Sequence, residues 1–125
     1  MKTPFILVKK GKGKQKLSNH KPGTPKEVLV EYGTIPSITQ IALGTLPAGT
    51  KTEPHQHPTM WEIYYILRGK AIYTIGEEKK EVDSGDFFAV PPGTLHCQHA
   101  IEEHVIYYFG VATDAFKQHK NLRPT

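Results

Sequence analysis

Residues 49–69 read GTKTEPHQHPTMWEIYYILRG, and this stretch decides the fold. It begins at Gly49, ends at Gly69 and carries His55, His57 and Glu62 between the two glycines. Residues two apart in a strand point to the same face, so His55 and His57 can project together into one cavity. The Pro-Thr pair that follows indicates a turn before the chain returns.

The glutamate of this stretch stands at the start of an apolar segment. Residues 61–67 read WEIYYIL, which is too apolar for a strand at a solvent-facing edge. Burying a carboxylate there is costly unless it is paired or bound to a metal. A cation held by His55 and His57 opposite Glu62 would remove much of this cost. We therefore interpret the three residues as parts of one metal site.

A second stretch, residues 85–100, reads GDFFAVPPGTLHCQHA. The Gly-Asp pair at its start indicates a turn that enters a strand, and the Pro-Pro-Gly run ends that strand sharply. His96 follows near the start of the next strand. A histidine just past a rigid turn is well placed for metal ligation, because the backbone fixes it before the metal arrives.

The two stretches resemble the two signature motifs of the cupin superfamily. The first matches throughout, and the second matches at Gly85, Pro91, Gly93 and His96. The family usually has an asparagine, which is not a metal ligand, where this chain has Ala100. The resemblance implies an all-β fold, a double-stranded β-helix or jelly-roll barrel with one metal inside. The ligands that it implies are His55, His57, Glu62 and His96.

These ligands would be imidazole nitrogens and a carboxylate, without a thiolate. Such a set favours manganese, iron or nickel, and zinc or cobalt would also fit. Four protein ligands close a tetrahedral zinc site, whereas an octahedral metal keeps two positions open for a substrate. The resemblance then implies dioxygenase, decarboxylase or isomerase chemistry on a small oxygenated molecule. The sequence singles out no catalytic residue beyond the ligands.

From residue 28 onward, short apolar segments alternate with glycine and proline. Many short strands at close spacing indicate a sandwich or barrel. Phe5–Val8 could add an edge strand that pairs across a dimer interface, and Asp114–Lys120 could form a short helix. The predicted strands are 28–32, 37–44, 50–55, 61–67, 71–75, 87–90, 94–99 and 105–111.

The alternation of side chains along the strands predicts which residues line a pocket. If Glu62 and His96 point inward, so do Tyr64 and Gln98, which would offer hydrogen bonds in a mostly apolar pocket. Core packing is an equal alternative for Tyr64, and a solvent-facing position for Gln98. Met60 is expected at the pocket mouth. A homodimer is expected from the resemblance and from three apolar residues that should face away from the pocket, against another sheet or another subunit. These residues are Trp61, Ile63 and Tyr65.

The other histidines and the single cysteine are interpreted as structural. His99 lies three residues after His96 and should face the other way. His104 follows two glutamates and is expected in an exposed turn, and the histidines at positions 20 and 119 lie near the ends. Cys97 alternates away from His96, so we interpret it as a core or interface residue. A lone cysteine allows no intrachain disulfide.

The net charge of +4 conceals two regions of opposite sign. Residues 1–26 hold eight lysines and no acid, and the rest of the chain has eight basic residues against twelve acidic ones. We therefore expect a basic, partly flexible arm over 1–26 and one domain over 27–125. The arm lacks arginine and interleaved aromatic residues, which argues against nucleic-acid binding. No segment suits a signal peptide or membrane span, so a cytoplasmic protein is expected.

The sequence leaves two functions open. The first is a metal-dependent enzyme that acts on a small oxygenated molecule. The second is a non-catalytic module that binds or senses a sugar or an organic acid, which the lack of an acid–base residue outside the ligands favours. The fold alone cannot decide between them, because one fold hosts many functions.

Overall fold

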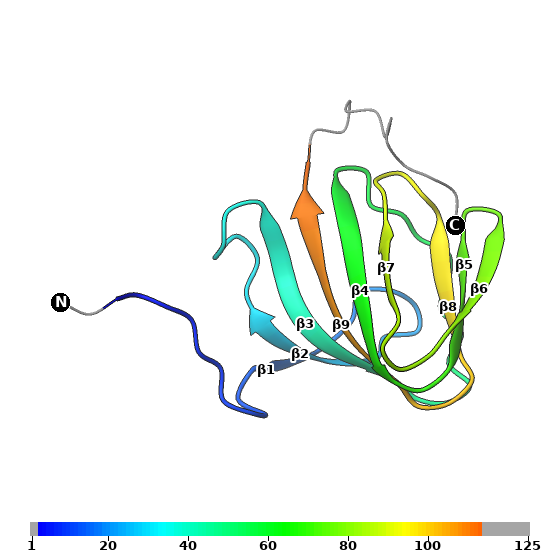
Figure 1. Ribbon diagram of the computed structural model, residues 1–125, viewed down its shortest axis with the longest axis horizontal. Helices are drawn as coiled ribbons and strands as arrows, with labels where there is room; N and C mark the ends of the chain where they lie inside the picture. Colours follow the sequence, from blue (N-terminus) through cyan, green and yellow to red (C-terminus); the bar gives the residue numbers. More distant parts are fainter. Residues whose placement is uncertain (1–2, 114–125) are drawn as a thin grey trace.

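The computed structural model describes residues 3–113, which form nine β-strands and no helix (Figure 1). The all-β class predicted from the sequence is confirmed. No helix that could cross a membrane is found in this part of the chain. The strands are β1 Lys14–Leu17, β2 Pro25–Val30, β3 Ile38–Leu46, β4 Met60–Arg68, β5 Ala71–Ile75, β6 Glu78–Val82, β7 Phe87–Val90, β8 His96–Ala100 and β9 His104–Ala112.

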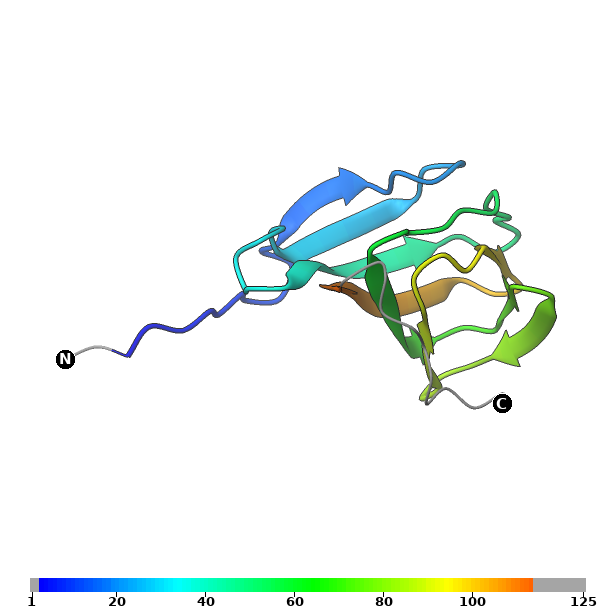
Figure 2. The same ribbon diagram turned by 90° about the horizontal axis from the view of Figure 1, so that it is seen from above.

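The strands form two antiparallel sheets that face each other. The larger sheet has the order β1-β2-β3-β9-β4-β7, and the smaller has the order β6-β5-β8. Figure 2 shows the larger sheet extending from the β1–β2 hairpin round to β7, with the smaller sheet opposite its β4–β7 end. This arrangement is the jelly-roll barrel that the sequence predicts.

Strand β4 alternates between the two faces of the larger sheet. Glu62, Tyr64 and Ile66 are buried, whereas Tyr65 is 45% exposed. Tyr64 stacks on Phe88 of β7 with ring centroids 4.6 Å apart, inside the core between the sheets. The predicted parity of β4 is thus correct, and it turns Glu62 toward the interior.

The predicted strands agree with the observed ones except at four places, one of which is the possible edge strand Phe5–Val8 described below. Residues 50–55 form no strand: Lys51 and His55 make only isolated bridges, to His99 and His96. Strands β1 and β6 were missed because KQKL and EKKEV are polar and largely exposed, so they show no alternation of apolar residues. The helix predicted at 114–120 lies outside the described residues.

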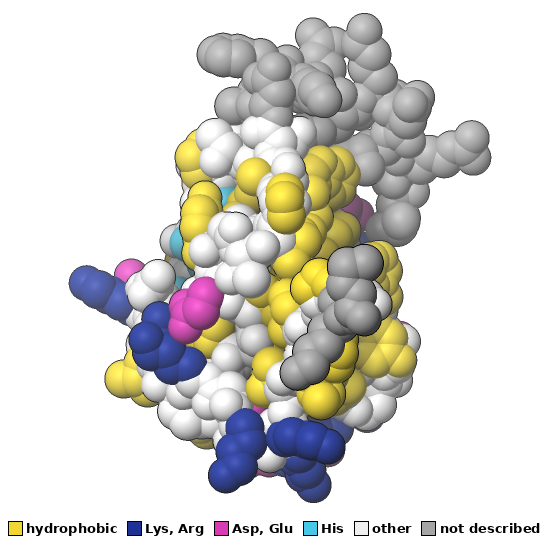
Figure 3. Space-filling view, turned by 90° about the vertical axis from the view of Figure 1, so that its left-hand side faces the viewer, with side chains coloured by type: hydrophobic (Ala, Val, Ile, Leu, Met, Phe, Trp, Pro, Cys, Tyr) yellow, Lys and Arg dark blue, Asp and Glu magenta, His cyan; other side chains and the backbone are white. Residues whose placement is uncertain are grey.

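The N-terminal segment contributes to the larger sheet from residue 14 onward. Strand β1 pairs with β2 in antiparallel register, so the sheet begins inside the segment 1–26. No strand is assigned to Phe5–Val8, and Phe5, Ile6 and Leu7 are exposed. Figure 3 looks onto this side of the molecule and shows hydrophobic side chains over much of the face, with lysine and arginine side chains gathered at its lower end.

The expectation of an exposed turn at His104 is wrong. His104 begins β9 and is 0% exposed. Its Nδ1 donates to the carbonyl oxygen of Gly69 at 2.7 Å, and its Nε2 accepts from the Tyr73 hydroxyl at 2.9 Å. Burial lowers the pKa of His104, although the Gly69 hydrogen bond opposes this shift. The preceding glutamates do form the turn, but the strand starts one residue earlier than expected.

Candidate metal centre

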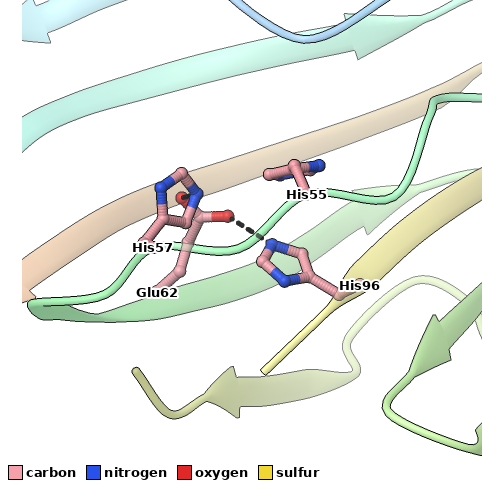
Figure 4. A group of neighbouring side chains, drawn as sticks. All are labelled: His55, His57, Glu62 and His96. Carbon is pink, nitrogen blue, oxygen red and sulfur yellow. Dashed lines mark hydrogen bonds and ion pairs between the residues drawn. The ribbon is translucent and has the colours of Figure 1, made fainter. Parts of the chain in front are cut away.

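Three segments bring the four predicted ligands together (Figure 4). His55 and His57 lie on the connection between β3 and β4, Glu62 lies on β4, and His96 begins β8. Reciprocal backbone hydrogen bonds join His55 to His96, with N···O distances of 3.0 and 2.9 Å. The site therefore lies where a loop, the larger sheet and the smaller sheet meet.

The four side chains direct their polar atoms at one small volume. One possible ligand atom from each residue can be chosen so that all lie within 4.8 Å of one another. Glu62 Oε2 lies 3.1 Å from His57 Nε2, and Glu62 Oε1 lies 3.3 Å from His96 Nε2. Neighbouring ligands of one metal are about 3 Å apart when each metal–ligand bond is ~2.1 Å. The cluster could therefore hold a metal ion.

The backbone fixes the orientation of two of the imidazoles. His96 Nδ1 donates to the Thr94 carbonyl oxygen at 2.9 Å, and His55 Nδ1 lies 3.3 Å from the Glu53 carbonyl oxygen. Each contact leaves Nε2 as the nitrogen with the free electron pair. Metal-binding histidines are commonly oriented in this way through their other ring nitrogen.

The donor atoms also need a cation. His57 Nε2 is buried and makes no hydrogen bond within residues 3–113. With its proton on Nδ1, His96 would turn an electron pair on Nε2 toward a carboxylate oxygen, and these atoms repel unless a proton or metal lies between them. Three imidazole nitrogens and one carboxylate suit a divalent transition metal. The residues present fit the metal that the sequence resemblance implies.

The electrostatics of the site keep Glu62 ionised. Burial alone would raise the pKa of Glu62, but the close contacts with the imidazoles of His57 and His96 and the hydrogen bond from Tyr64 outweigh it, so the pKa is lowered. The same contact with Glu62 raises the pKa of His57 against the effect of burial. Burial lowers the pKa of His55, and the neighbouring His96 adds to this shift. Glu62 is thus charged at neutral pH, as a metal-binding carboxylate must be.

We expect metal affinity to fall at acid pH, because a proton and a metal compete for the same imidazole nitrogen. Histidine has an ordinary pKa near ~6.5, and the raised pKa of His57 makes that residue an early site of protonation. Affinity should fall at least about a hundredfold between pH 7 and pH 5. Competition titration against a metal-binding dye measures this, and metal still held at about pH 4 would contradict a histidine-rich site.

A cavity of about 360 Å³ opens onto the cluster and is lined by His55, His57 and Glu62. Its size lies at the lower end of the range for small-molecule pockets. All three predicted pocket residues line it, which are Met60, Tyr64 and Gln98. Tyr64 and Gln98 are buried, with exposed fractions of 3% and 5%. The solvent-facing alternative for Gln98 is therefore wrong.

The hydrogen bonds of Tyr64 and Gln98 fix their positions. The Tyr64 hydroxyl donates to Glu62 Oε1, and burial together with the Glu62 charge raises the pKa of Tyr64, so the phenol keeps its proton. Gln98 Nε2 donates to the Tyr73 hydroxyl at 2.9 Å. Tyr64 therefore positions the Glu62 carboxylate directly, and Tyr73 holds the Gln98 amide at the cavity wall.

Sequence reasoning missed cavity residues on the β1–β2 hairpin and in the larger sheet. His20 lies on the loop between β1 and β2, with its ring centroid 6.0 Å from that of His55. The backbone N–H of Glu53 donates to the Lys21 carbonyl oxygen at 2.8 Å, which joins this loop to the His55 segment. No periodic pattern marks this loop in the sequence. Other lining residues that were missed are Lys26, Gln40 and Tyr108.

Comparison with known proteins identifies relatives of this chain by sequence. A family model described as a cupin domain matches residues 42–109. An uncharacterized protein of Methanocaldococcus jannaschii is 46% identical over 56 residues, which cover 45% of this chain and 45% of that protein. An uncharacterized protein of Streptomyces coelicolor is 35% identical over 63 residues, which cover 50% of this chain and 59% of that one. The matches thus span about half the length of these curated relatives.

Three solved structures show the same fold. A predicted oxalate decarboxylase of Thermotoga maritima superposes with a TM-score of 0.76 at 18% identity, over 86% of this chain and 99% of that one. KdgF from Halomonas sp. superposes with a TM-score of 0.71 at 22% identity, over 92% of this chain and 100% of that one. A salicylate 1,2-dioxygenase of Pseudoaminobacter salicylatoxidans superposes with a TM-score of 0.58 at 19% identity, over 62% of this chain and 22% of that one. At these identities the likeness concerns the fold alone.

Proposed function

The chain belongs to the cupin family, and from this premise we propose that it is a metal-dependent enzyme acting on a small oxygenated molecule. One divalent transition metal, with manganese, iron or nickel favoured, would be held by His55, His57, Glu62 and His96. The observation that carries the proposal is the convergence of these four side chains beside a cavity of about 360 Å³. The reaction would be of the dioxygenase, decarboxylase or isomerase type.

A bound metal would supply Lewis acidity or redox chemistry that the side chains lack. The chain itself supplies orientation and exclusion of water. Tyr64 holds Glu62 in place through its hydroxyl group, and its ring stacks on Phe88. Gln98, held by Tyr73, would orient a polar group of the substrate. These groups are set before a substrate arrives, which is the condition for efficient catalysis.

A non-catalytic binding module is the second candidate, and the composition of the cavity favours it. Glu62 is the only carboxylate among the described residues that line the cavity, and the cluster uses it. An enzyme of this kind would have to rely on the metal or on His20 for proton transfer. A protein that binds or senses a sugar or an organic acid needs no such group.

The experiment that separates the two candidates uses the full chain, purified without a tag and loaded with iron, manganese or nickel. The probes are oxalate, salicylate and fructose. Oxygen consumption, carbon dioxide release and NMR detection of isomers cover the three reaction types. Turnover that the His96→Ala variant loses supports an enzyme. Tight binding of a probe without turnover by any metal form would move the assignment to the binding module.

We further propose a homodimer through the outer face of β4, β7 and β9. Tyr65, Phe87 and Tyr107 are 45%, 62% and 38% exposed, and the strand register places Tyr65 opposite both of the others. A contiguous apolar surface of this kind is a typical interface between subunits. Light scattering of the purified protein measures the oligomeric state, and a monomer at micromolar concentration would contradict the proposal.

A further inference from the structure

Lys26 on β2 is a cation buried in the cavity wall. Its exposed fraction is 7%, and it lines the same cavity as Glu62. Along the strand, Lys26 and Val28 are buried, whereas Pro25 is exposed and Glu27 is half-buried. Charged lysine side chains are rarely buried to this extent without a partner. The position of Lys26 therefore needs an explanation.

The contacts of Lys26 do not neutralise its charge. Its Nζ donates to Gln40 Oε1, which is a neutral acceptor. No carboxylate within residues 3–113 lies at ion-pair distance from Nζ, whereas the exposed Lys16 on the adjacent strand lies 3.9 Å from Glu31. An ammonium group has three donors, so Lys26 keeps two for another acceptor. Burying such a charge is costly unless an anion pairs with it.

The charges around the cavity favour an anionic ligand. Glu62 supplies one negative charge, which the proposed metal already offsets. A divalent metal together with Lys26 would leave the cavity with a net positive charge, and a negative ligand would balance it. This step rests on the proposed function, because without the metal Glu62 and Lys26 would balance each other.

The chemistry of the wall points to a carboxylate rather than a phosphate. Phosphate sites commonly use a helix N-terminus, a series of backbone N–H groups or arginine side chains. Residues 3–113 contain no helix, and no arginine among them lines the cavity. One lysine with two free donors suits the two oxygens of a single carboxylate. Most of the surface area of the remaining wall is apolar, which is typical of small-molecule pockets.

We propose that Lys26 binds a carboxylate of the small molecule that the metal centre acts on or senses. The ligand class is therefore a small organic acid with a second oxygen-bearing group that reaches the His55, His57, Glu62 and His96 cluster. Lys26 is the residue that selects the acid over its neutral analogues.

The test measures binding of succinate and of succinamate, in which an amide replaces one carboxylate. Isothermal titration calorimetry uses the full chain with its metal content determined beforehand. The metal-loaded protein should bind succinate at least about tenfold more tightly than succinamate. Lys26→Met should remove this preference and keep the metal, and Lys26→Arg should retain part of it. Lys16→Met, at an exposed position on the adjacent strand, is the matched control and should bind like the unaltered protein.

The outcomes separate this inference from the proposed function. Metal-loaded Lys26→Met that still prefers succinate would overturn the role of Lys26, as would an unaltered protein that binds both probes equally. A protein that takes up no metal would instead contradict the proposed function, and elemental analysis reports this independently of the binding data. Circular dichroism of both Lys26 variants shows whether they are folded.

Discussion

Replacing His96 by alanine is expected to abolish metal retention, with affinity falling by more than about a hundredfold. His96 is 2% exposed, and its ring is fixed by the Thr94 carbonyl beside Glu62. Loss of a residue that only orients a ligand costs about 10- to 100-fold in affinity, so loss of a ligand should cost more. Elemental analysis of the protein purified without a tag measures the metal content of both forms.

His99→Ala is the matched control for this prediction. His99 lies on the same strand, three residues further along, and belongs to the face that points away from the cluster. This variant removes an imidazole from β8 without touching the site, so its metal content should equal that of the unaltered protein. Equal metal contents in the His96 and His99 variants would mean that His96 is not a ligand.

Gly69→Ala is expected to reduce the free energy of unfolding by more than about 3 kcal/mol. Gly69 has φ +85°, where an L side chain is strained. A Cβ atom at this position would also lie 1.8 Å from the carbonyl oxygen of Glu103, which is backbone and cannot move aside as a side chain could. A displacement of the backbone that relieved this clash would also disturb the hydrogen bond from His104 to the Gly69 carbonyl oxygen. Urea denaturation followed by tryptophan fluorescence measures the change.

Gly85→Ala separates the two causes. Gly85 has a similar φ of +87°, but a Cβ atom there would have no neighbour within 4 Å. Backbone strain alone should cost about 1–2 kcal/mol. If both variants lose the same stability, close contact with Glu103 contributes nothing and the account of Gly69 is wrong.

The sequence predicted the strands that have an apolar face and missed those without one. Strand β4 is apolar at nearly every position except Glu62, and the inward direction expected for Glu62 placed Tyr64 correctly. Strands β1 and β6 are held by backbone pairing at or near the sheet edges, with side chains that are mostly exposed. Their polar sequences show no period that a strand prediction could use.

The same distinction applies to the site. The spacing of the histidines and the glutamate, together with the glycines around them, identified the four clustered residues, because all four lie within two short motifs. His20 and Lys26 come from a distant hairpin, which the pairing of β2 with β3 and the hydrogen bond from Glu53 to Lys21 bring to the cavity. In the sequence, Lys26 was the last of eight lysines in a basic arm, and nothing in the charge count distinguished it. Tertiary structure alone shows that it is buried.

The measurement that tests the central claim most directly is anomalous X-ray diffraction from crystals of the protein as purified, at the absorption edge of the metal found by elemental analysis. The account predicts one strong peak within about 2.0–2.2 Å of nitrogen atoms of His55, His57 and His96 and of a Glu62 oxygen. A strong peak elsewhere in the molecule would contradict the claim. So would the absence of a peak at these four side chains in crystals of protein to which the metal had been added.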